Sequence, residues 1–460
     1  MSALAKTSDL AELLQITSER ANRYLEDLSE RSVAPAPDAI ERLKNLDIPL
    51  PSEPTDPAKV LAMLDDFGSP ATVATAGRRY FGFVTGGTLP AALAANWLAG
   101  AWDQCAGLVT MSPAAAYIEE IALRWLIEVF GFPPESGGGL TSGATMANFT
   151  CLAAARHAVL EEVGWNVEAQ GLFGAPSITV IVGEQVHVSV VKALGLLGLG
   201  RDRVLRVLAD DQGRMRADSL PRISGPTIVS IQAGEVNTGA FDPAAEVCAQ
   251  AHRDGAWVHV DGAFGLWALA APARAHLAAD VTQADSWATD AHKWLNVPYD
   301  SGIALVRDAR HLNASMATSA AYLVHVEKRE PNLHVPEMSR RARGVEIWAA
   351  LMSLGRSGLA DLIERNCRYA ARFAEGLSAA GYRILNDVVL NQVLVSFGDD
   401  DTTRRVIAGI QADGTCWCGG TVWRGQAAMR ISVSSWATTE EDVERSLEAM
   451  VRVAEAVRGH

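Results

Sequence analysis

The sequence predicts an α/β protein built on a mainly parallel β-sheet, and three observations support that fold class. Short runs rich in β-branched residues recur from about residue 175, as in SITVIVG, TIVSIQAG, WVHVD and SGIALV. Helical segments such as HVSVVKALG and PAAEVCAQAH separate most of these runs, and strands that alternate with helices form parallel sheets. The 460 residues are 49% apolar, enough to fill the cores of roughly two or three structural units.

The predicted elements fall into three regions. Residues 1–70 contain an amphipathic helix and then a proline-rich break, so we expect a helical arm. Residues 71–345 carry the alternating strands and helices of a large α/β domain, including a long helix that Ser112 can cap and Gly131 ends. Residues 346–460 are helical at first and then give two candidate strands, VLNQVLVSFG and AAMRISVSSW, and a final helix. This pattern is typical of a smaller α/β domain.

Composition and charge narrow the class of partner. The net charge of −14 argues against a nucleic-acid or anionic-membrane surface, because either partner needs a clustered positive face. Small molecules are therefore the expected partners. No apolar run is long enough to cross a bilayer and the N-terminus lacks a signal-peptide pattern, so we expect a cytoplasmic protein. The six cysteines lack the spacing of a zinc site, so we expect reduced thiols and predict no metal.

The stretch GGGLTSGATMANF, residues 137–149, joins a glycine-rich turn to the start of a helix. Free backbone N–H groups and the positive end of the helix dipole meet there, and a phosphate can bind. Gly143, Ala144 and Thr145 would supply the N–H groups, and Thr145 a hydroxyl as well. Glycine-rich helix starts without a ligand are also common, so this stretch alone leaves the phosphate site open.

Two further stretches place polar side chains after predicted strands. VHVDGAFG puts Asp261 at the carboxyl end of a buried strand, where α/β proteins bind ligands. The small residue Ala263 would leave room for a flat ring, although Asp-Gly also forms ordinary turns. EQVHVSV puts His187 and Ser189 at the start of a helix. The histidine there either caps and packs or stacks on an aromatic ligand whose polar edge Ser189 contacts.

The stretch TDAHKWLNVP, residues 289–298, sets Lys293 between a histidine and an apolar run. A lysine in partly apolar surroundings is a usable nucleophile for a carbonyl carbon. It lies 32 residues after Asp261 with one strand between them, so neighbouring sheet positions can bring both to one cleft. A lysine for a Schiff base, an acid for a basic ring nitrogen, a flat histidine and a phosphate site are together what pyridoxal phosphate requires.

The sequence resembles the group II pyridoxal-phosphate decarboxylases of the aspartate aminotransferase superfamily over roughly residues 60–450. The resemblance rests on YFGFVTGG, SPAAAYIEEIALRWL, GLTSGATMANFT, EQVHVSV, GAFDP, HVDGAFG, DAHKWLNVPYDSG and RRARGVEIW. It implies fold type I: a large domain with a mainly parallel seven-stranded sheet, a small C-terminal α/β domain and an N-terminal helical arm. It also implies a homodimer with active sites at the subunit interface.

The resemblance implies roles for individual residues as well. Lys293 would form the Schiff base with the cofactor, and Asp261 would keep the pyridine nitrogen protonated. His187 and Ala263 would pack on opposite faces of the ring, and His292 would lie beside the phosphate in the cup described above. The implied reaction is decarboxylation of an L-amino acid to the amine and carbon dioxide.

This sequence departs from the family pattern at several positions. The loop at 328–344 lacks the tyrosine that delivers a proton in the family's aromatic amino acid decarboxylases. We predict His334 as the donor instead, because it alone there titrates near neutrality; a solvated loop histidine is the alternative. Asp290 stands where the family often has asparagine, and we expect its carboxylate to turn to a backbone amide. Asn237 and Thr238 have no predicted role.

These departures leave the reaction open between classes. An aromatic or bulky substrate is expected, because Phe81, Phe83, Trp97 and Trp102 lie in stretches that line the family's pocket; core packing is the alternative for Trp97 and Trp102. The alternatives are an aldehyde synthase, an aminotransferase, a carbon–carbon lyase, or a cofactor-binding protein without catalysis. Arg430 sits where the superfamily's aminotransferases hold the substrate carboxylate, and we favour slightly the other interpretation, a surface-strand arginine.

Overall fold

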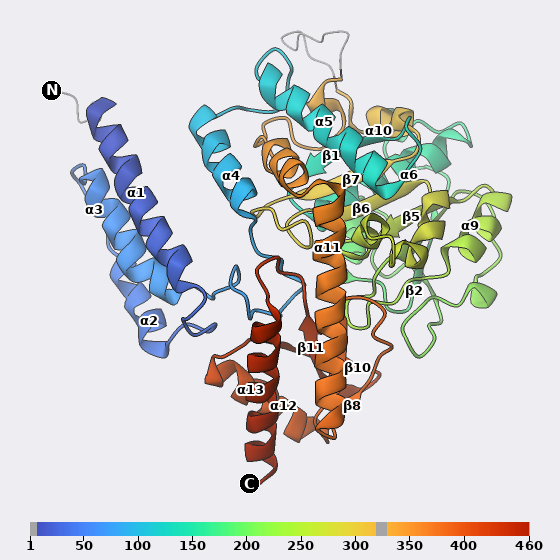
Figure 1. Cartoon of the computed structure of the whole chain (residues 1–460). Helices are drawn as coiled ribbons and strands as arrows, with labels where there is room; N and C mark the ends of the chain where they lie inside the picture. Colours follow the sequence, from blue (N-terminus) through green and yellow to red (C-terminus); the bar gives the residue numbers. More distant parts are fainter. Residues whose placement is uncertain (1–6, 319–328, 460) are drawn as a thin grey trace.

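The computed structural model describes residues 7–318 and 329–459 of the chain (Figure 1). The N-terminal residues form an arm of helices that stands apart from the rest in Figure 1. The first arm helix packs against the third, and Arg20 joins them to the following turn by an ion pair with Asp65 at 2.6 Å. The arm elements are α1 (Thr7–Asp27), α2 (Pro37–Arg42), η1 (Leu43–Leu46), α3 (Pro57–Met63), η2 (Leu64–Gly68) and η3 (Ser69–Ala71).

A seven-stranded sheet forms the centre of the large domain, as the sequence predicts. Its strand order is β1-β7-β6-β5-β4-β2-β3, and β7 alone runs antiparallel to its neighbours. Every residue of the four strands from β4 to β7 is buried, which explains their almost continuous apolar sequences. The strands are β1 (Gly137–Thr141), β2 (Thr179–Gly183), β3 (Leu205–Val207), β4 (Thr227–Gln232), β5 (Trp257–Asp261), β6 (Ser286–Asp290) and β7 (Gly302–Val306).

Helices pack around this sheet (Figure 1). The long helix α5 ends at Gly131, whose φ of +66° suits glycine. The predicted cap at its start is wrong, since the Ser112 hydroxyl donates to the carbonyl of Cys105 at 2.7 Å. The elements are α4 (Pro90–Trp102), α5 (Pro113–Phe130), α6 (Ala144–Glu161), α7 (Val167–Gln170), α8 (Val188–Leu196), η4 (Ala217–Ser219), α9 (Ala244–Arg253), η5 (Gly265–Ala270), η6 (Ala275–Leu277), η7 (Ala279–Gln283), α10 (Ala309–Met316) and η8 (Pro331–Leu333).

The C-terminal part adds a second sheet of strand order β10-β11-β9-β8. The two predicted strands are β9 and β11. Helix α11 links this part to the large domain, and the boundary predicted between residues 345 and 346 falls in its first turn. That boundary and the one between residues 70 and 71 remain predictions. The elements are α11 (Gly344–Ala379), β8 (Arg383–Ile384), β9 (Gln392–Ser396), α12 (Asp400–Asp413), β10 (Gly419–Trp423), β11 (Gln426–Ser432) and α13 (Glu440–Arg458).

The predictions about the cysteines and about membrane-spanning segments can be compared with this fold. All six cysteines are free thiols, and five of them are buried. Within residues 7–318 and 329–459, no helix combines the length and the apolar character that a bilayer crossing requires.

Candidate active site

The carboxyl ends of neighbouring parallel strands gather the predicted site residues. Asp261 is the last residue of β5 and pairs with Ala288 of β6, and Lys293 follows three residues after β6 ends. His187 follows β2 and begins α8. Burial lowers the pKa of His187, and the charges that act on this ring next are those of Asp261 and Lys293. The predicted acid, lysine and histidine therefore lie close together at this edge of the sheet, the candidate cofactor cleft.

Asp290 connects the lysine to the glycine-rich turn. Its Oδ2 lies 3.0 Å from Lys293 Nζ, and its Oδ1 accepts a hydrogen bond from the Ala144 N–H at 2.6 Å. The expectation that this carboxylate turns to a backbone amide is confirmed. One N–H group of the predicted phosphate cup therefore has an internal acceptor, and those of Gly143 and Thr145 remain the predicted phosphate donors.

His292 lies beside the same turn, as expected. A Cβ atom at Gly143 would meet the His292 ring at 3.3 Å. The His292 Nδ1 accepts from the Ser301 N–H at 3.1 Å, so Nε2 carries the proton of the neutral ring, 3.5 Å from Asp290 Oδ1. Burial lowers the pKa of His292 and favours that neutral form.

The donors at this turn fit a phosphate group. The Ser301 hydroxyl is buried and has no hydrogen-bond partner among the described residues. The next residue, Gly302, is so close to Gly143 that a side chain there would clash with the Gly143 backbone. An unsatisfied hydroxyl, backbone N–H groups at the α6 start and the His292 N–H are phosphate ligands. The Asp290 carboxylate is the one unfavourable group beside them.

Asp261 is held by short-range hydrogen bonds. Its Oδ1 accepts from the Ala263 N–H, and its Oδ2 lies within hydrogen-bond distance of the Ser189 hydroxyl, both at 3.3 Å. The same hydroxyl lies 2.7 Å from His187 Nδ1, which also accepts from the Ser189 N–H. The structure thus shows His187 as a helix cap, which leaves the ring face available to a ligand.

A buried chain of polar side chains continues from Asp261 into the sheet. Asn148 Nδ2 donates to Ser189 Oγ at 3.3 Å, and Asn148 Oδ1 lies 2.8 Å from His259 Nε2. The His259 Nδ1 lies 2.9 Å from the Ser286 hydroxyl. Burial lowers the pKa of His259 to about 3, so the ring is neutral. One ring nitrogen then accepts a hydrogen bond and the other donates one, so that each group in the series can donate to the next in the direction of Asp261. We did not predict this series of side chains, which lie on helices α6 and α8 and on strands β5 and β6.

Aromatic side chains form a wall near the same cleft. Tyr299 stacks on His292 with ring centroids 4.2 Å apart. Trp417 stacks on Tyr80 at 5.1 Å and lies 5.5 Å from Phe83. Burial raises the pKa of Tyr80 to about 12, and Tyr299 acts on it next. These four aromatic rings are brought together from both ends of the chain.

Of the four aromatic residues predicted to line a pocket, Phe83 alone joins this wall. Phe81 is fully buried and packs edge-on against Phe373 of α11 at 5.0 Å. Trp97 and Trp102 lie on α4 and are half-exposed. Their prediction as pocket residues is not supported within one chain.

Arg430 reaches the cleft from the second sheet. Burial lowers its pKa, and Glu235 and Tyr80 are the charged or titratable neighbours that act on it. It is also among the charges acting on His187. Among the described residues it forms no ion pair within 4.0 Å. Arg430 is half-buried, and its role stays a prediction.

Asn237 and Thr238 position the acid beside Arg430. Their backbone N–H groups donate to Glu235 Oε2 at 2.7 and 2.8 Å. Thr421, on β10, donates to Asn237 Oδ1 at 3.0 Å. The two residues without a predicted role thus fix Glu235 and tie the two sheets together.

His334 lies elsewhere. Arg329, Glu119 and Arg340 are the charges that act on this ring, and burial lowers its pKa to about 3. Its Nδ1 has no hydrogen-bond partner in the described part of the chain. The ring is half-buried, and both the donor role and the solvated-loop alternative remain predictions. Residue 328, the start of the predicted loop, lies outside the described residues.

The cleft defines a class of protein: a lysine and an acid at the carboxyl edge of a fold type I sheet, beside a phosphate-binding helix start, form the site of a pyridoxal-phosphate-dependent enzyme. The family model described as "Pyridoxal-dependent decarboxylase conserved domain" matches residues 43–398. The chain belongs to this family. It is therefore a pyridoxal-phosphate-dependent enzyme of the decarboxylase family.

Individual relatives agree with this assignment. The chain is 31% identical over 395 residues to L-2,4-diaminobutyrate decarboxylase of Rhizobium meliloti, covering 80% of this chain and 76% of that protein. It is 26% identical to aromatic-L-amino-acid decarboxylase of Bacillus atrophaeus, covering 80% and 78%. The crystal structure of Oryza sativa TDC with PLP and tryptamine shares the fold, with a TM-score of 0.90, 22% identity and 99% of each chain covered. The relatives differ in substrate.

Proposed function

We propose that this protein decarboxylates an L-amino acid with an aromatic or other bulky side chain, with Lys293 as the residue that binds the cofactor's aldehyde. The observation that carries the proposal is the group of aromatic rings, one of which, Tyr299, stacks on the residue next to the lysine. Tyr299 stacks on His292, and Trp417 lies between Tyr80 and Phe83. Flat rings at stacking distance favour a flat or apolar side chain.

Bound pyridoxal phosphate supplies an electron sink for the bond that is broken at the substrate's Cα. The residues of this chain do the rest. Asp261 holds a proton at the pyridine nitrogen, and the hydrogen bonds from Ser189 and Ala263 fix the carboxylate in place. His187, held at the helix start by its own capping bonds, presents a neutral ring face. The helix start and Ser301 bind the phosphate.

Arg430 is the proposed partner of the substrate carboxylate. It is half-buried, acts on the His187 ring and has no ion pair among the described residues. A guanidinium without an ion-pair partner fits the carboxylate of an incoming substrate, which it binds through two hydrogen bonds. The same observation favours a second candidate, an aminotransferase or another reaction that retains the carboxylate, because a tightly bound carboxylate is held against leaving.

The products separate the two candidates. The holoenzyme is incubated with a panel of L-amino acids, and carbon dioxide, amine, aldehyde, keto acid and hydrogen peroxide are measured. We expect equal amounts of carbon dioxide and amine, with aromatic amino acids turned over fastest. Keto acid without carbon dioxide would overturn the proposal in favour of transamination, and aldehyde with peroxide would assign an aldehyde synthase.

His334 stays the proposed proton donor on sequence grounds. Its pKa of about 3 leaves the imidazole neutral at physiological pH, and a neutral imidazole is a weak acid, which counts against this role. Loss of a general acid typically lowers a rate by about 10²–10⁴-fold. A His334→Gln enzyme that forms amine at the wild-type rate would remove this residue from the mechanism.

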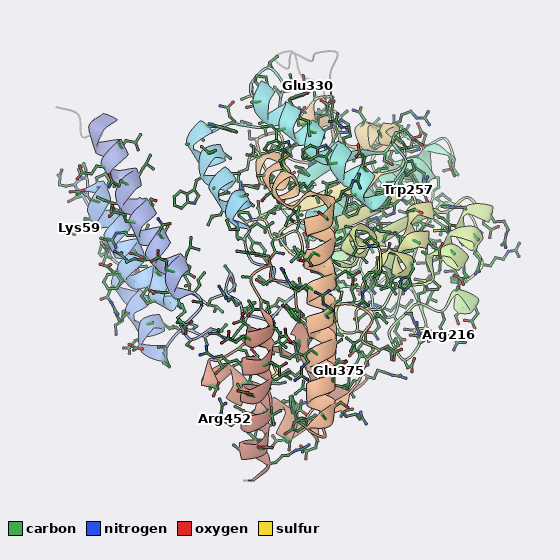
Figure 2. The ribbon with its side chains drawn as sticks, in the orientation of Figure 1. Lys59, Arg216, Trp257, Glu330, Glu375 and Arg452 are labelled. Atoms are coloured by element: carbon green, nitrogen blue, oxygen red, sulfur yellow. The ribbon has the colours of Figure 1, made fainter. Side chains whose placement is uncertain are left out.

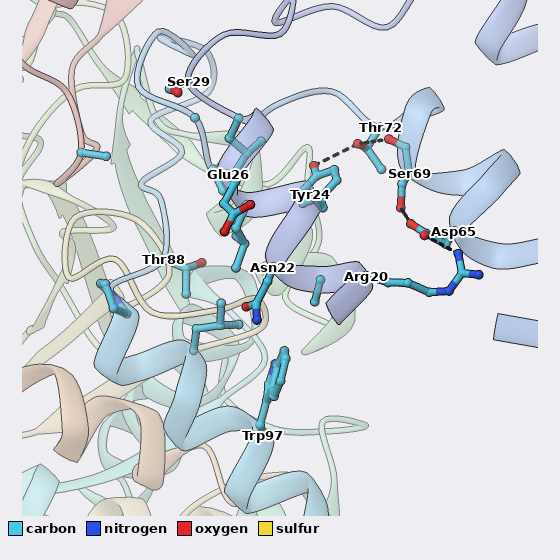
Figure 3. A pocket seen from close by; sticks show the side chains of 18 of the residues that line it. Arg20, Asn22, Tyr24, Glu26, Ser29, Asp65, Ser69, Thr72, Thr88 and Trp97 are labelled. Atoms are coloured by element: carbon cyan, nitrogen blue, oxygen red, sulfur yellow. Dashed lines mark hydrogen bonds and ion pairs between the residues drawn. The ribbon is translucent and has the colours of Figure 1, made fainter. Parts of the chain in front are cut away.

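The proposal includes a homodimer. A cavity of about 1060 Å³ separates the arm from α4, and Figure 3 shows Asn22 of the arm and Trp97 of α4 facing it. Apolar side chains on both sides are exposed in the single chain, among them Leu14, Trp97 and Leu98. Exposed apolar surface of this kind is typical of an interface, and a second copy of the chain is the partner we propose. Light scattering should give twice the chain mass.

A further inference from the structure

Two histidines and a carboxylate meet at the end of α6 that is remote from the glycine-rich turn. His157 and Glu161 are four residues apart on α6, so they share one face of the helix. His311 comes from the first turn of α10, which packs along α6 on the side of the molecule away from the arm (Figure 1). One possible ligand atom from each of the three residues lies within 4.8 Å of the other two.

The distances in this cluster match a metal site better than a set of hydrogen bonds. The His157 Nε2 lies 3.5 Å and the His311 Nδ1 lies 3.6 Å from the same oxygen, Glu161 Oε2. Hydrogen bonds between nitrogen and oxygen are about 2.7–3.2 Å long. Ligand atoms bound tetrahedrally to Zn²⁺ by bonds of about 2.0–2.1 Å are about 3.4 Å apart. Small side-chain movements would therefore complete the coordination.

The surroundings orient the first histidine for metal binding. The other ring nitrogen, His157 Nδ1, lies 2.7 Å from Glu168 Oε2. A histidine that donates one N–H to a carboxylate turns the lone pair of its other nitrogen outward, as metal-bound histidines usually do. That lone pair points to the Glu161 carboxylate, which is also an acceptor, and a cation between them would remove the repulsion.

Packing holds the ring of His311, the third proposed ligand, and the cluster is open to solvent on the Glu161 side. The His311 ring packs edge-on against Trp257 at 5.6 Å, a residue labelled in Figure 2. His157 is buried, whereas the Glu161 side chain is 60% exposed. An ion can therefore arrive from solvent, and a water molecule can take the remaining position.

We propose that His157, Glu161 and His311 bind a divalent transition-metal ion, with Zn²⁺ as the ion that suits two imidazoles and one carboxylate. The site is separate from the cofactor cleft, because the two lie at opposite ends of α6, a helix about 27 Å long at 1.5 Å per residue. The metal joins α6 to α10 and stabilises the folded chain. It takes no part in the reaction at Lys293.

The test uses the holoenzyme after dialysis against a chelator. Titration with Zn²⁺ in a calorimeter should show one tight site per chain, and Co²⁺ should give the visible bands of a tetrahedral complex. Glu161→Gln and His311→Ala should each weaken Zn²⁺ binding at least about tenfold, and Glu168→Gln about tenfold. The neighbouring exposed residue provides the matched control, Glu162→Gln, which should bind Zn²⁺ as the wild type does. Glu161→His should restore binding.

The same experiment includes controls for folding and for the cofactor site. Zn²⁺ should raise the melting temperature of the wild type and not that of Glu161→Gln, whose metal-free melting temperature should equal the wild-type value. Lys293→Ala should keep full Zn²⁺ binding. Absence of a tight site, equal affinity in the Glu161 and Glu162 variants, or loss of binding in Lys293→Ala would each overturn the proposal.

Discussion

The Asp290 carboxylate lies 3.0 Å from the Lys293 ammonium and places a negative charge at the start of α6, where the cofactor's phosphate is proposed to bind. A carboxylate and a phosphate dianion repel each other. The ion pair with Lys293 offsets this repulsion only while the lysine carries a proton, and the lysine must lose that proton to attack an aldehyde.

Asp290→Asn should therefore strengthen phosphate binding. The asparagine oxygen can still accept from the Ala144 N–H, while the negative charge is removed. We expect the ratio of pyridoxal phosphate affinity to pyridoxal affinity to rise about tenfold, equivalent to about 1.4 kcal/mol. Titration of the apoenzyme with both compounds measures this ratio. Asp361→Asn removes an exposed carboxylate on α11 and should leave it unchanged; a lower ratio in Asp290→Asn would mean that the acid helps to hold the phosphate.

Lys293→Ala should abolish covalent attachment of the cofactor. Among the described residues its amine is the one that lies next to Asp290 and His292, so its removal takes away the nucleophile that the structure places there for the aldehyde. Borohydride reduction followed by mass spectrometry of the intact chain should show the added cofactor mass in the wild type and in Lys192→Ala, an exposed lysine on α8, but not in Lys293→Ala. A reduced adduct in the variant would place the attachment at another lysine.

The residues of the cleft that the sequence predicts all lie in continuous motifs at strand ends. Asp261 and Lys293 follow two adjacent parallel strands, so alternation of strands and helices is enough to bring them together. Asp290 likewise sits in the same motif as its lysine. For such residues the topology decides the position, and topology can be derived from local patterns.

The remaining residues depend on contacts between distant segments. Arg430 and Trp417 come from the C-terminal part, and Glu235 from the turn after β4. The registers of β10 and β11 against each other and the packing of α11 decide whether these side chains face the cleft. A one-residue shift would turn Arg430 to the opposite face, and no local pattern fixes that register.

The series of hydrogen-bonded side chains from His259 to Asp261 predicts that a substitution away from the cofactor changes both stability and the cofactor's titration. In Asn148→Leu the His259 N–H loses its acceptor and Ser189 loses a donor, so the free energy of unfolding should fall by about 1–3 kcal/mol. The carboxylate of Asp261 should also hold the pyridine proton less well, and the pH at which the cofactor's visible absorbance changes should move down. Thr150→Val is the control, because Thr150 is buried on the same helix and donates only to the Met146 carbonyl. An absorbance titration equal to that of the wild type would disconnect Asn148 from Asp261.

Buried neutral histidines should make the protein less stable in acid. The folded pKa of His334 is about 3, below the ordinary value of about 6.5. Between these two values the unfolded chain binds a proton that the folded chain does not, so the stability is complete above about pH 6.5 and falls as the pH falls toward 3. His334→Gln should make this fall shallower by up to about 1.4 kcal/mol per pH unit. Urea unfolding at a series of pH values measures the slope, and His276→Gln, at an exposed histidine on η6, should leave it as in the wild type.

Replacement of Arg430 tests how the substrate carboxylate is held. Arg430→Gln removes a half-buried cation that lies near His187 and Tyr80, and a charge-assisted pair of hydrogen bonds contributes about 1.5–3 kcal/mol. We therefore expect KM for the amino acid to rise by about 10- to 100-fold. The amine product lacks the carboxylate, so its inhibition constant should change less than twofold. Arg424→Gln, at an exposed arginine between β10 and β11, is the matched control. If the substrate and the amine are weakened equally, Arg430 shapes the pocket without binding the carboxylate.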